Sequence, residues 1–283
     1  MKKTLKALAA LTLAAALTGC GSSGGSSADS EKVIKVGATS VPHAEILENI
    51  VKDVLAKDGW TLEVTTFQDY VLPNTSLDAK ELDANYFQTL GYMKNQNEER
   101  GLHLVAAAGV HIEPMGFYSE TLTDIKDLKD GASIGIPNDT DNEIRAVDLL
   151  IAKGLLNDPK TEYTPENLDQ VFAKGSDANP HGYVLQPIEA ASLPTRLADL
   201  DGAVINGNYA LEAKLPEKHP AVFIESFDEE TTIRRTNFIV VNEGTQDSDK
   251  IKALVKAIQS DDVKKYIEDT YKGAVIPSFI AGN

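Results

Sequence analysis

The chain has 283 residues, a formal net charge of −16 at pH 7 and a single cysteine. This acidic excess argues against a nucleic-acid partner, because phosphate backbones are bound by basic surfaces. One cysteine rules out an intramolecular disulfide, so packing alone must hold the fold together. Roughly 250 residues follow a polar segment near the start, which is enough for one large domain or two modest ones.

The first 31 residues have the pattern of an export signal followed by a tether. Lys2, Lys3 and Lys6 precede an apolar run that ends at Leu17-Thr18-Gly19-Cys20. The run of about a dozen residues is too short to span a bilayer and predicts a signal peptide over residues 1–19. Residues 20–31 are mostly glycine, serine, alanine and aspartate, a composition typical of a flexible tether.

The four residues that end the apolar run resemble the bacterial lipobox, in which the cysteine is acylated and becomes the first residue of the mature protein. Two or three acyl chains are needed for stable attachment to a bilayer. We therefore expect Cys20 to be lipidated and the protein to be anchored to the cell membrane on its extracytoplasmic face. The alternative is an incidental thiol at the end of an ordinary signal peptide.

After the tether, the chain alternates strands and helices. A strand at 34–38, a helix at 42–58 and a strand at 62–66 form one βαβ unit, and a strand at 132–136 with a helix at 141–153 begins another. Thr140 and Glu143 have the spacing of a capping box. Such units build parallel sheets that bind ligands at the carboxyl ends of their strands.

Weaker patterns fill the rest of the chain. Residues 203–205 predict a buried strand followed by a turn and a short helix, 222–224 and 238–241 predict further strands, and two amphipathic helices end the chain. Residues 157–187 are rich in Asp, Asn, Pro and Gly, which indicates loops with at most one series of helical turns.

Enzyme motifs are missing from the sequence. It contains no phosphate-binding glycine-rich loop and no His-Glu-x-x-His. Two stretches fit Gly-x-Ser-x-Gly, residues 21–25 and 131–135, but the first lies in the tether and the second opens a predicted strand, so neither is the strand-to-helix turn of a nucleophile elbow. We therefore expect neither catalysis nor a cofactor. The histidines also lack close metal-ligand spacing, so we predict no metal site. A meeting in space of His43, His103, His111 and His181, as in a zinc carrier, is the alternative.

Polar side chains follow the predicted strands where an open α/β sheet binds ligands. Arg145 lies in the first turns of a helix, where a carboxylate would be favoured, or it pairs with Glu143 or Asp141 on a solvated face. Asn206 follows a buried strand, although asparagine there also suits a turn. Asn237 opens a strand, where a strand-edge cap is the plain explanation.

Aromatic residues gather in the same early half of the chain. An apolar or thioether side chain is bound well between rings, which makes Tyr70, Tyr86 and Tyr118, all beside turns or loops, candidates for pocket walls. Core packing is the alternative for most aromatic residues here.

Six ordered blocks resemble the NlpA family, the methionine-binding lipoproteins of ABC importers. They are Gly37-Ala-Thr with Pro42-His43-Ala-Glu-Ile-Leu, Phe67-x-Asp69-Tyr70-Val-x-Pro73-Asn74, Leu82-Asp-Ala-Asn85-Tyr86-Phe87-Gln88, Glu113-Pro-Met-Gly116-x-Tyr118-Ser119, Ile136-Pro-Asn138-Asp139-x-x-Asn142-x-x-Arg145-Ala, and Ala203-Val-Ile-Asn206-x-Asn208-Tyr209-Ala. The resemblance implies an α/β type 2 periplasmic-binding-protein fold, two α/β lobes with a ligand cleft and two hinge-crossing strands. We expect lobe 1 over 32–114 plus 237–283 and lobe 2 over 115–236.

The resemblance also implies roles for individual residues. Arg145 would hold a ligand carboxylate, Asn206 and Asn237 would bind the amino-acid backbone, and the side chain would lie against aromatic walls. The walls are Tyr70, Tyr86 and Phe87, and Asn142, Tyr118 and His43 complete the predicted ligand-binding set. The chain departs from the family pattern at Thr89, where many members have histidine, and at Thr140 and Ile144, where Pro and Gly are frequent.

These features predict a receptor that captures an L-amino acid, methionine foremost, and delivers it to an ABC permease and its ATPase. Another amino acid or a short methionine-containing peptide is the first alternative. A metal carrier, an adhesin or an exported enzyme are further ones.

Overall fold

The computed structural model describes residues 32–282, and of Glu229 and Glu230 only the backbone. The predicted signal peptide, Cys20 and the tether therefore lie outside the described residues. Within 32–282, no helix is both long and apolar enough to cross a membrane. The residues from Lys32 onward form one compact unit.

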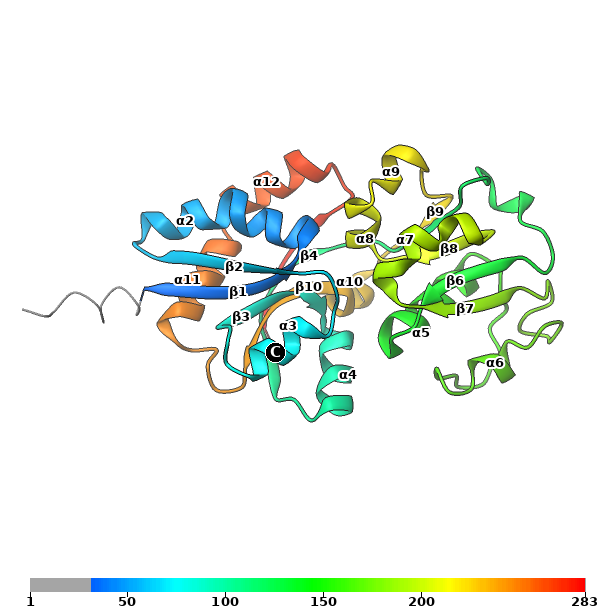
Figure 1. Cartoon of the computed structure of the whole chain (residues 1–283), viewed down its shortest axis with the longest axis horizontal. Coiled ribbons are helices and arrows are strands. Elements are labelled where there is room, and N and C mark those ends of the chain that lie inside the picture. The colour runs from blue at the N-terminus through cyan, green and yellow to red at the C-terminus, as the bar shows by residue number, and fades with distance from the viewer. Residues whose placement is uncertain (1–31, 283) are drawn as a thin grey trace, which may run out of the picture. The chain divides into compact units, whose positions relative to one another are not determined.

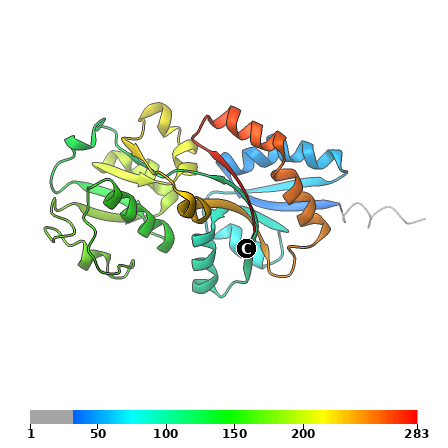
Figure 2. The ribbon, with the colours of Figure 1, turned by 180° about the vertical axis from the view of Figure 1, so that it is seen from behind.

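Two separate β-sheets organise this unit (Figures 1 and 2). The first, the core of what we call lobe 1, has six strands in the order β11-β4-β10-β3-β1-β2. Its strands are β1 (Val33–Thr39), β2 (Thr61–Phe67), β3 (Ala84–Thr89), β4 (Leu104–Ile112), β10 (Thr236–Asn242) and β11 (Ile276–Ala281). β1 runs parallel to β2 and β3, whereas β10 is antiparallel to both of its neighbours.

The second sheet, the core of lobe 2, has five strands in the order β7-β6-β8-β5-β9. They are β5 (Gly116–Tyr118), β6 (Ser133–Pro137), β7 (Val184–Ile188), β8 (Gly202–Ile205) and β9 (Phe223–Ile224). β6 is parallel to β7 and β8, and β5 is antiparallel to β8 and β9.

Helices cover both sheets. Lobe 1 carries η1 (Ser40–Ala44), η2 (Leu47–Val51), α2 (Lys52–Lys57), α3 (Leu72–Asp78), α4 (Leu90–Arg100), α11 (Asp249–Ile258) and α12 (Asp261–Tyr271). Lobe 2 carries η3 (Ile125–Asp127), α5 (Thr140–Ala152), α6 (Leu168–Val171), η4 (Ala190–Ser192), α7 (Leu193–Arg196), η5 (Leu197–Asp199), α8 (Gly207–Glu212) and α9 (Leu215–Lys218). In Figure 1, α2, α11 and α12 lie along the first sheet, and their apolar faces join β1 in one buried core.

The chain passes between the two sheets twice. The first passage joins the end of β4 at Ile112 to the start of β5 at Gly116, and the second joins β9 to β10 through α10 (Glu229–Arg235). Glu113 and Arg235 are buried in these passages. Charged residues are rarely buried unless they are paired, so both passages mark the region between the lobes as a place of specific polar contacts.

Most of the expected elements are present, with four differences. The two amphipathic helices α11 and α12 do not end the chain, because β11 follows them and pairs with β4. The helix expected over 42–58 is built from two π-helical turns followed by α2. Residues 184–188, expected as part of a loop region, form the edge strand β7, because their backbone pairs with β6. The capping box was wrong, since α5 is capped by Asp139, whose side chain accepts from Asn142 N.

Candidate binding site

A small cavity lies between the two lobes, where β3, β10 and the first passage face α5 and the start of α8. It is lined by Tyr70, Phe87, Gln88, Thr89, Tyr92, Glu113, Asn142, Arg145, Asn206, Gly207, Asn208 and Asn237. Its volume is about 30 Å³, which is room for about two water molecules. An amino acid is larger, so ligand entry requires the cavity to widen.

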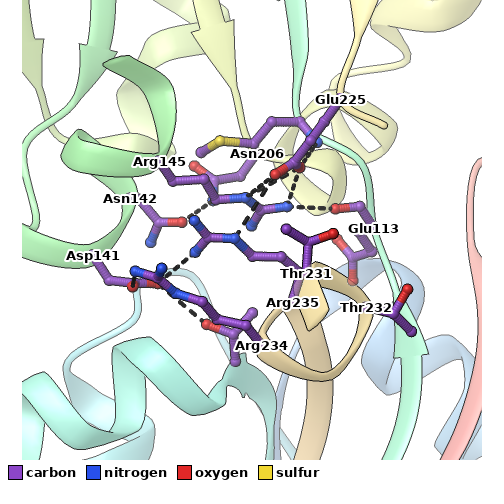
Figure 3. A network of polar contacts seen from close by, with 12 residues as sticks. Glu113, Asp141, Asn142, Arg145, Asn206, Glu225, Thr231, Thr232, Arg234 and Arg235 are labelled. Atoms are coloured by element: carbon purple, nitrogen blue, oxygen red, sulfur yellow. Dashed lines mark hydrogen bonds and ion pairs between the residues drawn. The ribbon is translucent and has the colours of Figure 1, made fainter. Parts of the chain in front are cut away.

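Arg145 is held in place by a carboxylate from the second passage (Figure 3). Its Nη2 donates to Glu225 Oε2 at 2.5 Å and to the Glu113 carbonyl oxygen at 3.0 Å, and its Nε lies 3.1 Å from Glu225 Oε1. Neither alternative partner on its own helix is used. Nη1 makes no hydrogen bond within residues 32–282 in this arrangement, which leaves it available to a ligand.

A second buried arginine extends this network. Arg235 Nη1 lies 3.3 Å from Asp141 Oδ2, and its Nε lies 3.8 Å from Glu225 Oε1. Burial, followed by the nearby Arg145 charge, lowers the pKa of Arg235 to about 10. Arginines and carboxylates therefore alternate along the lobe boundary, in the order Arg145, Glu225, Arg235 and Asp141.

Two amide atoms facing this region have no partner. Asn206 Oδ1 and Asn208 Nδ2 are buried without a hydrogen bond among the described residues. Their other amide atoms are fixed, because Asn206 Nδ2 donates to Asn142 Oδ1 at 2.9 Å and Asn208 Oδ1 accepts from Tyr70 at 2.5 Å. Leaving a buried polar group unpaired costs about 1–3 kcal/mol. Both residues line the cavity, so a ligand that offers one donor and one acceptor would remove this cost.

A buried cluster of two histidines and a carboxylate lies behind the cavity. His111 Nε2 lies 2.6 Å and His43 Nε2 lies 3.2 Å from Glu113 Oε1. Tyr86 bonds His111 Nδ1, and Thr39 Oγ1 lies 2.8 Å from His43 Nδ1. Desolvation lowers the pKa of His43 to about 4 and that of His111 to about 3, so both rings are neutral at pH 7.

This cluster is the one place within 32–282 where three metal-ligating side chains converge, with ligand atoms within 4.8 Å of one another. A tetrahedral zinc site with bonds near 2.0 Å separates its ligand atoms by about 3.3 Å. The 2.6 Å contact between His111 and Glu113 is too short for that geometry. Hydrogen bonding accounts for the cluster as it stands, and His181 pairs instead with Asp130.

Aromatic rings form one wall of the cavity. Tyr70 stacks on Tyr209 with ring centroids 4.9 Å apart and meets Phe87 and Tyr92 at 5.7 and 5.6 Å. Their flat faces provide the apolar side of an otherwise polar cavity. Tyr118 lies elsewhere, in a separate hollow with Leu211 and Ile224.

The structure brings six of the predicted ligand-binding residues to the cavity. These are Tyr70, Phe87, Asn142, Arg145, Asn206 and Asn237. Tyr86 and His43 are buried in the histidine cluster instead, although His43 Nε2 reaches Asn237 Oδ1 at 3.2 Å.

Several lining residues were missed from the sequence, above all Glu113 and Asn208. A signal for Glu113 was present, because an acid that directly follows an apolar strand is unusual unless it is used. Asn208, like Asn206, follows a predicted strand where an open α/β sheet binds ligands, but the predicted ligand-binding set did not include it.

Known proteins resemble this chain over nearly its whole length. Residues 34–279 match the model of the NlpA lipoprotein family. The methionine-binding lipoprotein MetQ of Bacillus subtilis is 35% identical over 98% of this chain and 99% of its own. The D-methionine-binding lipoprotein MetQ of Escherichia coli is 33% identical over 97% of each chain.

Solved structures show the same fold. A nutrient binding protein from Burkholderia cenocepacia, bound to methionine, is 36% identical, with a TM-score of 0.76 over 87% of this chain and all of its own. The predicted fold of two α/β lobes is thereby confirmed. Where the chain divides between the lobes stays a prediction.

Proposed function

Because the chain belongs to the NlpA lipoprotein family, we propose that it is a lipid-anchored extracytoplasmic binding protein that captures an L-amino acid, methionine foremost, for an ABC importer. The named relatives are binding proteins for methionine or D-methionine. The cavity contains a free arginine nitrogen and unpaired amides, which are groups that bind a ligand by hydrogen bonds.

The unpaired amides carry this proposal. Asn208 Nδ2 is a donor and Asn206 Oδ1 is an acceptor, and both are buried at the cavity. With Arg145 Nη1, they offer two donors for a carboxylate and one acceptor for an ammonium. An α-amino acid presents these two groups on one carbon, so it matches the polar side of the cavity, while the rings of Tyr70 and Phe87 suit a thioether.

The lobes meet closely around the cavity. Tyr70 bonds Asn208 across the boundary, and Thr140 Oγ1 donates to Glu99 Oε1 at 2.7 Å. A cavity of about 30 Å³ cannot admit an amino acid while these contacts hold. We propose that the lobes separate to load the ligand and close around it, which excludes water and strengthens each charged contact.

A ligand screen tests the proposal. A ligand present at 100 times its dissociation constant stabilises the folded state by about 2.7 kcal/mol. Melting temperatures should therefore rise with methionine, and mass spectrometry of the native protein should detect a co-purified amino acid. The proposal is wrong if neither methionine nor any other L-amino acid shifts the melting temperature.

A longer ligand is the second candidate, favoured by a larger hollow beyond Thr89. This hollow has a volume of about 560 Å³ and is lined in part by Gly91, Asp141 and Ile144. Thr89 Oγ1 and Asp141 Oδ2, 3.4 Å apart, separate it from the cavity. Methionine-containing dipeptides belong in the same melting screen, and a larger shift with a dipeptide than with methionine would favour this candidate.

The membrane anchor is tested separately. Intact-mass measurement of protein from membranes should show acyl chains on Cys20, and Cys20→Ala should release the protein from the membrane fraction. An unmodified thiol on membrane-bound protein would contradict the anchor.

A further inference from the structure

Glu113 holds a buried carboxylate at the cavity that none of the predicted roles uses. The residue is 5% exposed and lies in the first passage between the lobes. Its Oε1 is close to Asn237, because His43 Nε2 lies 3.2 Å from both Glu113 Oε1 and Asn237 Oδ1. Gly207 lies next to the other carboxylate oxygen, Oε2, so closely that a Cβ atom at position 207 would be 3.3 Å from it. Asn237 and Gly207 both line the cavity, so the carboxylate lies in its wall.

The two histidines hold this carboxylate with N–H groups. An ionised carboxylate can only accept, so Nε2 of each ring must carry the proton that points at it. Each Nδ1 then accepts, from the hydroxyl of Thr39 in one ring and from that of Tyr86 in the other. The hydroxyls fix both tautomers, and the nearby Asn208 backbone N–H favours the ionised carboxylate by lowering the pKa of Glu113. This arrangement orients Glu113 without neutralising it.

No cation of the described chain pairs with Glu113. Its ion-pair partners within 32–282 are the two histidines, which are neutral at pH 7. The nearby Arg145 guanidinium donates to the backbone carbonyl oxygen of Glu113, and its ion pair is with the Glu225 carboxylate. A buried anion with hydrogen bonds but no cation is costly, and burial raises the pKa of Glu113 above its usual range.

We propose that Glu113 is the counterion for the α-ammonium of the ligand. Asn206 Oδ1, also unpaired, lies in the same cavity and accepts a second ammonium hydrogen. The carboxylate of the ligand goes to Arg145 Nη1 and Asn208 Nδ2. This inference rests on the proposed function and narrows it to ligands with a free α-ammonium, which excludes deaminated and N-acylated molecules.

Calorimetric titration with two ligands tests the proposal in the whole purified protein. One ligand is L-methionine, and the other is 4-(methylsulfanyl)butanoate, which keeps the carboxylate and the thioether but lacks the ammonium. We expect the wild type to bind methionine about 100-fold more tightly, as for one partner of a buried charge pair. Glu113→Gln should bind methionine about 100-fold more weakly than the wild type does, whereas its affinity for the butanoate should stay within about threefold of the wild-type value.

The matched control is Glu143→Gln, which removes a buried carboxylate from α5 that does not line the cavity. It should leave both affinities unchanged. Equal affinity of the wild type for the two ligands would overturn the role of Glu113. It would also be overturned if Glu113→Gln weakened the binding of both ligands by the same factor, because a purely structural role predicts that result. Equal wild-type affinities would overturn the proposal even if the variant failed to fold. If the wild type binds methionine neither in the titration nor in the melting screen, the assignment of methionine as the ligand falls instead.

Discussion

Removing Arg145 should destabilise the fold as well as abolish ligand binding. Arg145 is 4% exposed, and the Glu225 side chain is 13% exposed. Breaking a buried ion pair by removing one partner costs about 3–5 kcal/mol, because the other charge stays buried. Arg235 Nε lies 3.8 Å from Glu225 Oε1 and supplies part of the lost attraction. We therefore expect Arg145→Met to lower the free energy of unfolding by about 2–3 kcal/mol.

A double variant separates the lost pair from lost packing. Arg145→Met combined with Glu225→Gln removes both charges and should recover the free energy of unfolding to within about 1 kcal/mol of wild type. Arg196→Met is the matched control, since its partner Asp199 lies in an exposed pair and the change should cost less than about 0.5 kcal/mol. Urea denaturation followed by circular dichroism at pH 7.5 measures all three.

The pH dependence gives a second readout of the same pair. Burial alone would raise the pKa of Glu225, but the Arg145 guanidinium and its hydrogen bonds outweigh burial and hold this pKa below its usual value. The pair therefore stabilises the fold above the pKa of an unfolded glutamate, about 4.3, and this stabilisation is lost as the pH falls through the lower folded value. A single variant as stable as wild type at pH 7.5, or a double variant as unstable as the single one, would refute this reasoning.

Three further changes probe the lobe boundary and its surroundings. In Gly91→Ala the new Cβ would collide with the Asp141 carboxylate across the boundary, so calorimetry should show about tenfold weaker ligand binding with no loss of folding stability. Tyr70→Phe removes the hydrogen bond that fixes the Asn208 amide and should weaken binding by about three- to tenfold, whereas unchanged affinity would show that the amide needs no orientation. Burial and nearby acids raise the pKa of Glu143 to about 7. As the pH rises, the unfolded state therefore loses this proton before the folded state does, which destabilises the wild-type fold at high pH. In urea titrations, Glu143→Gln should be about 1–2 kcal/mol more stable than wild type at pH 8 and equally stable at pH 4.

Local patterns in the sequence were enough to predict many of the strands and helices, whereas the two lobes were expected only from the family resemblance. Ile34, Val36 and Ala38 alternate in a run that became β1, and all three are fully buried. β7 was missed because it is an edge strand with Pro187 inside it and little periodicity, so only its pairing with β6 reveals it. The cap of α5 was displaced by one residue because Asp139 competes with Thr140 for the same role.

The site was harder to predict than the fold, since its contacts join distant parts of the chain. Arg145 was expected to bind a ligand carboxylate, and this role stays a prediction. Its partner Glu225 lies 80 residues away and carries no local signal. Tyr86 and His43 were expected to contact the ligand, but both are buried behind the cavity. There His43 contacts the Glu113 carboxylate directly, and Tyr86 bonds His111, the other histidine that contacts it. Spacing along the chain shows which residues are polar at strand ends, but it does not show which of them pair with each other.

The crystal structure of the protein with L-methionine tests the central claim most directly. We expect the ligand between the lobes, with its carboxylate in hydrogen-bond reach of Arg145 Nη1 and Asn208 Nδ2 and its ammonium at Glu113 and Asn206. The thioether should lie against Tyr70 and Phe87. A ligand bound outside this cavity, or one with its carboxylate turned away from Arg145, would contradict the account.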